Sequence, residues 1–261
     1  MLARRSDILK PALIALALWA QPASAEPPGA AVRLYTQGQF LAAAERAEAQ
    51  TSPSSLAFAA RALMAACITE PDAANLNAWL NRAERAAREA LQLDTNSVEA
   101  RLQWALVLGV RGRRAGLTEA VSRNYAPRGR RLIEQAIALE PNNAWAHALM
   151  GGWHLEVLRR GGRTGARLYG ARLTTGLAEF ERARDLAPDD AMIMVQYAIA
   201  LIELDANLYG DRARALLAEA ENAPARDAFE AHTLSAARDV ASAYDAHGGR
   251  AAQAAARAAF L

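Results

Sequence analysis

The side chains in this chain of 261 residues that could do chemistry are four histidines, one cysteine and many arginines. His147 and His154 lie seven residues apart, with Glu156 nearby. On a helix that spacing separates two histidines by about 10 Å along the axis, which is too far for one metal ion, whereas an i,i+4 pair such as His-Glu-x-x-His would fit. We therefore expect His154 to be an interior or groove histidine, and we expect no metal site.

Nucleophilic catalysis finds no support either. Cys67 is the only cysteine, so no intrachain disulfide can form, and the stretch ARALMAACI puts it on the apolar face of a helix. A buried small hydrophobe is expected there rather than a reactive thiol. His232 and His247 stand alone, and no serine or cysteine has the context of a catalytic triad. The sequence predicts a protein that is not an enzyme, with no catalytic residue and no cofactor.

The arginines remain as candidates, because guanidinium groups bind carboxylates and phosphates in a planar, two-pronged geometry. The stretch RRGGRTGARLYG lacks the Gly-Lys-Ser/Thr ending and the strand-to-helix setting of a phosphate-binding loop, so we interpret it as a basic turn between helices. A solvated face is the alternative for the whole set. Trp145, at the start of a predicted helix, is a candidate groove-lining aromatic. The other candidate partner- or anion-binding residues are Arg111, Arg113, Arg114, Arg128, Arg130, Arg131, Arg159, Arg160, Arg163, Arg167, Tyr169 and Arg172.

Charge is distributed unevenly along the chain. Residues 111–172 form a basic zone with 12 arginines and four acidic residues. Without its first 25 residues the chain loses two arginines, one lysine and one aspartate, which leaves 27 arginines against 27 acidic residues. A net charge of zero, together with export, argues against nucleic acid as a partner.

The first 25 residues have the organisation of a cleavable signal peptide. Three basic residues precede the apolar run PALIALALWA, and Ala23-Ser24-Ala25 matches an A-x-A cleavage site. The apolar run is about half as long as the ~20 residues that a membrane span needs. We predict cleavage after Ala25, a periplasmic or secreted location, and a single domain over residues 26–261.

The candidate residues must be positioned by helices. Alanine and arginine dominate the composition, while β-branched and aromatic residues are sparse, which favours helix over strand. One helix–turn–helix junction occurs three times, at residues 88–105, 133–151 and 181–198. Each copy has an alanine, a leucine three residues later, then Thr or Pro, two polar residues, and a second helix with a large residue followed by a small one.

Each position of this junction has a physical explanation. The alanine and leucine are expected on the buried face of a helix that is ending. Pro141 and Pro188 cannot continue that helix but are tolerated where the next begins, and the polar residues after them can cap it. Small residues such as Gly151 leave room for large ones such as Phe180 from an adjacent helix pair. Trp104 is expected to point inward.

The pattern resembles the tetratricopeptide repeat. In the best copy the resemblance rests on Met150, Gly151, Gly176, Phe180, Ala183 and Pro188. The standard repeat has about 34 residues, whereas the central copies here are 46 and 47 residues apart, and the excess is the two Arg-rich stretches between the helices of a unit. The resemblance implies an all-α, right-handed solenoid of four or five antiparallel helix pairs with extended central repeats and a concave groove.

The stretches MGGWHLEVLRR, GARLYGARL and FERARDLAPDD are also similar to the tetratricopeptide domains of the regulator of microtubule dynamics family, which carry a comparable long insertion. That resemblance implies the architecture and not the microtubule role, because an exported protein does not meet microtubules. Some members of that family are associated with phospholipid binding. We therefore expect an exported protein that binds a protein or peptide partner in its groove, with binding of an anionic small ligand or phospholipid by the Arg-rich inserts as the alternative.

Overall fold

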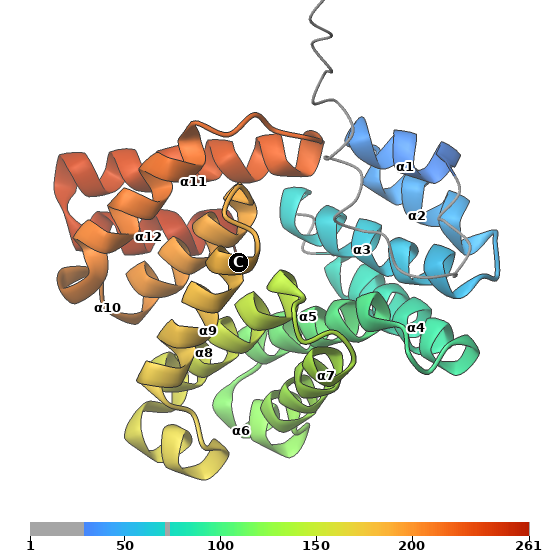
Figure 1. Ribbon diagram of the computed structural model, residues 1–261, viewed down its shortest axis with the longest axis horizontal. Coiled ribbons are helices and arrows are strands. Elements are labelled where there is room, and N and C mark those ends of the chain that lie inside the picture. The colour runs from blue at the N-terminus through green and yellow to red at the C-terminus, as the bar shows by residue number, and fades with distance from the viewer. Residues whose placement is uncertain (1–28, 71–73, 261) are drawn as a thin grey trace, which may run out of the picture.

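The computed structural model describes residues 29–70 and 74–260, and within these ranges the regular structure is all helix, as predicted (Figure 1). The predicted signal peptide lies outside the described residues. The helices are α1 (Gly29–Thr36), α2 (Phe40–Glu48), α3 (Pro53–Thr69), α4 (Leu76–Leu93), α5 (Val98–Arg114), α6 (Leu117–Ser122), α7 (Tyr125–Leu139), α8 (Ala144–Tyr169), α9 (Leu173–Leu186), α10 (Ala191–Glu221), α11 (Ala228–His247) and α12 (Gly249–Phe260).

Helix α10 is folded back on itself. Asp205 has extended backbone angles (φ −163°, ψ 97°), and its carboxylate accepts hydrogen bonds from the N–H groups two and three residues later, as a helix N-cap does. The Arg212 guanidinium lies 5.0 Å from the ring centroid of Tyr197, although a straight helix would place these two residues about 22 Å apart. Two antiparallel limbs, residues 191–204 and 206–221, therefore make up α10.

Among the described residues, α10 is also the one helix whose length and composition would allow it to cross a membrane. Its most apolar window is 61% buried inside the fold, and the turn at Asp205 interrupts the helix. Buried core helices pass the same test, so the finding assigns no membrane span.

Helix α8 bends in the same way, at Gly162. This residue has φ 54° and ψ −150°, a backbone conformation that glycine adopts without the clash of a Cβ atom. The residues after it fold back, so that a Cβ atom built on Gly165 would lie 3.6 Å from the carbonyl oxygen of Val157. We call residues 163–169 the α8 spur.

The helices pack as successive pairs. The pairs are α1 with α2, α3 with α4, α5 with α7, α8 with α9, the two limbs of α10, and α11 with α12. The first helices of neighbouring pairs also pack together, α3 on α5, α5 on α8 and α8 on α10, and Figure 1 shows the pairs following one another round a curve. The prediction of a helical solenoid is confirmed, although the described ranges contain six pairs rather than four or five.

All three repeated junctions are helix boundaries, as predicted. Pro141 and Pro188 lie between consecutive helices. Ser97, Asn143 and Asp190 are the N-caps of α5, α8 and α10, and each side chain accepts a backbone N–H two or three residues later, at 3.0–3.3 Å. The local signals in the sequence therefore determine where these helices stop and restart.

The leucines of the repeated junctions differ from the prediction. The alanines Ala90, Ala136 and Ala183 are fully buried, but Leu93 and Leu139 are 57% and 41% exposed. Three residues advance a helix by about 300°, so the leucine points about 60° away from the buried alanine around the helix axis. It also belongs to the last turn, which projects toward the connecting loop.

The predicted contact between a large and a small residue exists. A Cβ atom built on Gly151 would lie 2.6 Å from Cδ2 of Phe180 and 2.9 Å from the carbonyl oxygen of Gly176. Phe180 is buried and stacks on Tyr197, with ring centroids 4.5 Å apart. The sequence predicted that Gly151 and Phe180 would meet between neighbouring pairs, whereas they meet inside the α8–α9 pair, and the Tyr197 stack connects this pair to α10.

Helix α11 joins the two ends of the solenoid. Helices α8–α12 build a C-terminal core cluster, and helices α1–α5 build an N-terminal one. The middle of α11 packs into the C-terminal cluster through Leu234, while Phe229 at its start packs on the N-terminal cluster. Figure 1 shows α11 running across the top of the molecule to the side of α1, so the curve is closed by a contact between its ends.

Candidate binding surface

Two of the predicted arginines belong to an ion-pair network between α5, α8 and α10. The Arg113 guanidinium lies 3.1 Å from the buried carboxylate of Glu203 and 3.5 Å from that of Glu156. Arg159 pairs with Glu156 at 2.7 Å. Burial raises the pKa of Glu156, but the hydrogen bond from Arg159 and the charge of Arg113 together lower it by more. The pKa therefore lies below its usual range. Glu156 therefore stays ionised inside the network.

Four further candidates are also engaged within the fold. Arg111 and Arg128 lie 3.3 and 3.5 Å from the carboxylate of Glu84. Arg160 donates hydrogen bonds to the carbonyl oxygens of Gly112 and Ala115 at the end of α5. Arg130 pairs with Glu134 at 2.7 Å and donates to the carbonyl oxygen of Tyr169 at 2.9 Å. Each of these arginines already makes at least one contact within the fold.

The other arginines of the basic zone are exposed and make no ion pair with the described part of the chain. Arg172 is the N-cap residue of α9 and belongs to this group. Arg123, at the end of α6, belongs to it as well, although the sequence analysis did not select it. The remaining four are Arg114, Arg131, Arg163 and Arg167.

Apolar side chains that the sequence analysis missed lie among these arginines. Leu117 and Val121 of α6 are 59% and 50% exposed, and Leu168 of the α8 spur is 66% exposed. The spacing of Leu117 and Val121 puts both on one side of a single helical turn. A stretch of six residues is too short for its hydrophobic periodicity to distinguish a helix from a loop in the sequence.

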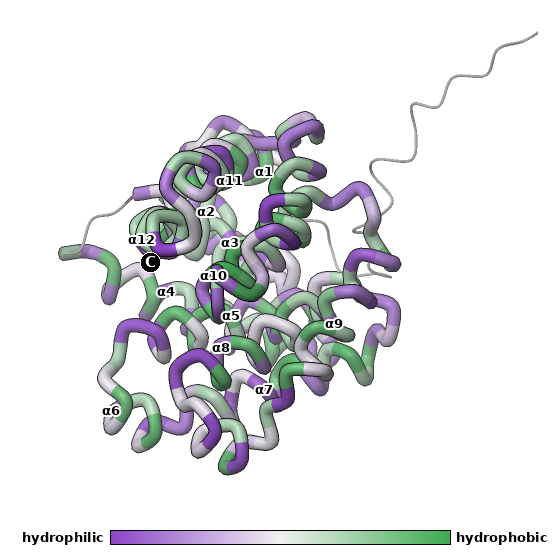
Figure 2. The backbone as a smooth tube through the Cα atoms, turned by 90° about the vertical axis from the view of Figure 1, so that its left-hand side faces the viewer, coloured by the Kyte–Doolittle hydropathy of each residue, from purple (hydrophilic) through white to green (hydrophobic). Residues whose placement is uncertain are grey.

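The tertiary structure brings the two inserts to one edge of the molecule. Arg160 of α8 binds the end of α5, and Arg130 of α7 binds the backbone of the α8 spur. Figure 1 places α6 and the yellow spur at the lower edge, and Figure 2 shows α6 at the same edge with green apolar segments. We call this surface the insert edge, and its members are Arg114, Leu117, Val121, Arg123, Arg131, Arg163, Arg167 and Leu168.

An open pocket of about 550 Å³ lies at the insert edge. The Arg130 guanidinium lies 5.1 Å from the ring centroid of Trp153, and Trp153 donates its indole N–H to the carbonyl oxygen of Ala126 at 2.8 Å. Arg131 is the lining guanidinium without an ion pair in the described residues. An aromatic wall beside one available cation suits an anionic group attached to an apolar body. The lining residues are Pro127, Arg130, Arg131, Glu134, Trp153, Leu168 and Tyr169.

The structure separates the candidate aromatics. Tyr169 lines the pocket at the insert edge. Trp145 is half-buried, packs against two core clusters and does not line that pocket. Trp104 is only partly buried, because its indole N–H donates to Glu84 at 3.2 Å and its ring lies beside the Arg128 guanidinium. Trp104 packs against two core clusters, in agreement with the expectation that it points inward, but it is not fully buried.

The histidines have structural partners. His154 is 4% exposed, and its Nδ1 accepts the backbone N–H of Arg172 at 3.1 Å, which confirms a satisfied interior histidine. Nδ1 of His147 lies 2.6 Å from Glu179, and its Nε2 lies 2.9 Å from the carbonyl oxygen of Pro141. Within the described ranges, no three or more His, Cys, Asp or Glu side chains are grouped so that they could hold a metal ion.

Cys67 is half-buried in α3. Burial raises the pKa of its thiol to about 12, which disfavours the thiolate that a nucleophile or metal ligand needs. The expectation of an unreactive apolar position agrees with this environment.

Lowering the pH is expected to destabilise the protein through His154. Burial and the charge of Arg130 lower the pKa of this imidazole below its unfolded value of about 6.5. The unfolded state therefore binds the proton first, so the contribution of His154 to stability is complete above that pH and is lost as the pH falls below it, at up to about 1.4 kcal/mol per pH unit. Urea unfolding at about pH 7.5 and about pH 5.5 measures this loss, and His154→Leu should reduce it.

The matched control for this prediction is His232→Ala, since His232 is exposed. This variant should keep the pH dependence of the unaltered protein. Comparison of His154→Leu with His232→Ala and with the unaltered protein therefore isolates the effect of the His154 side chain. An equal loss of stability in the unaltered protein and in His154→Leu would contradict the assignment.

Comparison with known proteins identifies one family. No curated protein matches the chain. The model of the family described as regulator of microtubule dynamics protein 1-3 matches residues 33–245, which is most of the chain and includes both inserts. The chain therefore belongs to the regulator of microtubule dynamics protein 1-3 family.

Proposed function

We propose that this protein is a non-enzymatic, exported interaction module of the tetratricopeptide type that binds an acidic segment of a partner protein. The observation that carries the proposal is the insert edge, where five arginines without ion pairs in the described residues lie beside three exposed apolar side chains. Guanidinium groups bind carboxylates with two hydrogen bonds, and exposed apolar side chains supply the area that a partner can bury. The repeat pattern supports the tetratricopeptide type, and the predicted signal peptide supports export.

The inner side of the solenoid is a weaker candidate than the insert edge. Arg61 of α3 pairs with Glu99 of α5 at 2.7 Å, and Arg113 of α5 pairs with Glu203 of α10, so ion pairs connect the first helices of successive pairs. The start of α11 closes the curve. A partner entering the groove would have to compete with these contacts, whereas a partner at the insert edge would not.

A second candidate function is docking on an anionic membrane surface. Leu117, Val121 and Leu168 are exposed next to arginines, an arrangement that suits partial insertion beside acidic lipid headgroups. Each arginine near such a surface contributes about 1 kcal/mol of attraction. This candidate shares the insert edge with the first, so the two must be separated by the identity of the partner.

Charge reversal at the insert edge is expected to abolish binding. The variant Arg123→Glu, Arg131→Glu, Arg163→Glu and Arg167→Glu should lower the yield of crosslinked protein complexes in intact cells at least tenfold, because it replaces four attractive charges with repulsive ones. The matched control reverses four exposed arginines elsewhere that make no ion pair in the described residues: Arg85, Arg238, Arg250 and Arg257. If both variants crosslink equally well, the insert edge is not the binding surface.

Vesicle flotation separates the two candidates. Under the protein-partner proposal, the purified chain binds phosphatidylglycerol and phosphatidylcholine vesicles equally weakly. Under the membrane alternative, it floats with phosphatidylglycerol vesicles only, and both the charge reversal and a Leu117→Ser, Val121→Ser, Leu168→Ser variant remove that binding. Selective flotation that these variants do not alter would contradict both.

A further inference from the structure

The first turn of α11 contacts helices from the other end of the chain. Phe229 meets the ring of Phe40 edge-on, with centroids 6.4 Å apart. Gly38 lies in the turn between α1 and α2 with φ 81°, and a Cβ atom built there would lie 3.1 Å from Cβ of Ala228. Glycine at this position thus permits both the left-handed turn and the close approach of α11.

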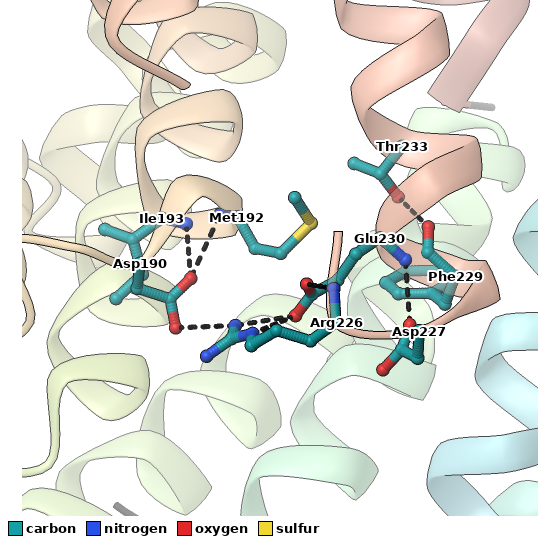
Figure 3. Close-up of polar contacts among 8 residues, drawn as sticks. All are labelled: Asp190, Met192, Ile193, Arg226, Asp227, Phe229, Glu230 and Thr233. Atoms are coloured by element: carbon teal, nitrogen blue, oxygen red, sulfur yellow. Dashed lines mark hydrogen bonds and ion pairs between the residues drawn. The ribbon is translucent and has the colours of Figure 1, made fainter. Parts of the chain in front are cut away.

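Polar contacts within the start of α11 and with the start of α10 surround this turn (Figure 3). Asp227 caps α11 by accepting the N–H of Glu230 at 2.9 Å. The Glu230 carboxylate accepts the backbone N–H of Arg226 at 2.7 Å and its Nε at 2.6 Å. The same guanidinium reaches Asp190, the N-cap of α10, at 3.4 Å. The projection Asp227-Ala228-Phe229 is thus held by contacts within the start of α11 and with the start of α10, in addition to its contact with Phe40.

The surface that receives the projection is aromatic. The Tyr35 ring lies 5.1 Å from Phe40 and 5.5 Å from Phe58, centroid to centroid. Burial, followed by the negative charge of Asp227, raises the pKa of the Tyr35 hydroxyl. The surface therefore offers an aromatic floor for a phenylalanine.

We propose that Tyr35, Phe40 and Phe58 form a peptide-binding site for a helix start of the type Asp-x-Phe, and that the protein fills this site with its own residues 227–229. The site is distinct from the insert edge and does not depend on the function proposed above. A partner segment with the same chemistry enters when the first turn of α11 leaves. The closed solenoid is then the self-inhibited form of this site.

The way α11 is anchored would allow a partner segment to replace its first turn. Ala228 and Phe229 are only half-buried on the N-terminal cluster. The rest of α11 is held in the C-terminal cluster by Leu234, Ala237 and Val240. One turn can therefore detach while the helix stays in place, as helix ends commonly do in native proteins. The displaced turn leaves aromatic side chains for a competing segment to cover.

A peptide of residues 224–235 with a fluorescent label at its N-terminus tests the proposal by anisotropy on the full chain. Phe229→Ala weakens the internal competitor, so this variant should bind the peptide at least tenfold more tightly than the unaltered protein does. Hydrogen exchange of the amides in residues 29–48 should be faster in the variant, and the added peptide should slow it again. A peptide with alanine in place of its phenylalanine should not bind.

Two further variants complete the test. Leu208→Ala removes an exposed side chain elsewhere and should behave like the unaltered protein. Arg226→Ala removes the contact of the α11 start with Asp190, while the backbone N–H of residue 226 can still donate to Glu230, and it should also strengthen peptide binding. The proposal is overturned if neither variant of the α11 start binds the peptide better than the unaltered protein, or if the alanine-containing peptide binds equally well. Neither outcome would affect the insert edge.

Discussion

Replacing Gly151 with alanine lowers the free energy of unfolding by about 1–3 kcal/mol, because the added methyl group has no space. It would lie 2.6 Å from a ring carbon of Phe180 and 2.9 Å from the carbonyl oxygen of Gly176. Alanine is favoured over glycine inside a helix by about 1 kcal/mol, so overpacking must exceed that gain. Urea unfolding followed by circular dichroism measures the result.

The matched control is Gly129→Ala. Gly129 is also buried within a helix, but a Cβ atom built on it would meet nothing within 4 Å. This substitution should raise the free energy of unfolding by up to about 1 kcal/mol. Phe180→Leu should restore part of the stability lost in Gly151→Ala, because it removes the ring that the methyl group meets. If Gly151→Ala were as stable as Gly129→Ala, the close packing of α8 on α9 would be refuted.

The second large effect is expected for Arg113→Met. Glu203 has a buried carboxylate whose ionic partner in the described residues is Arg113. Removing the guanidinium leaves a charge in the interior without compensation, and breaking such a pair costs about 3–5 kcal/mol. We expect the lower end of this range, since the Arg113 side chain is 26% exposed. Urea unfolding again provides the measurement.

The Arg113 prediction has its own controls. The double variant Arg113→Met, Glu203→Met should recover most of the lost stability, because an apolar pair of similar volume avoids the buried charge. Arg123→Met, at an exposed arginine without an ion pair in the described residues, should alter stability by less than about 0.5 kcal/mol. A small effect of Arg113→Met alone would return Arg113 to the candidates for partner binding.

The arginines illustrate how far the sequence predicts the candidate site. It identified the basic zone, and four members of the insert edge, Arg114, Arg131, Arg163 and Arg167, were among its candidates. It could not separate them from Arg113, whose acidic partner Glu203 lies 90 residues away. It also missed Arg123, because nothing in the local pattern shows that the end of α6 is exposed.

Local interactions explain what the sequence by itself determined. The prolines and caps at the repeated junctions act within a few residues of chain, so the helix boundaries around Pro141 and Pro188 follow from the residues themselves. The buried alanines at the repeat positions follow from helical periodicity in the same way. These signals were sufficient to establish an all-α chain of paired helices.

Only the tertiary structure decided which side chains remain available for a partner. The fold-back of α10 at Asp205, the closure of Phe229 on Phe40 and the gathering of both inserts at one edge all depend on contacts between segments far apart in the chain. Such contacts form when helices already made pack together, and side-chain pairing then depends on the distance between them. An arginine is the same residue in the sequence whether its neighbour in space is a carboxylate or solvent, and packing alone determines which of the two it meets.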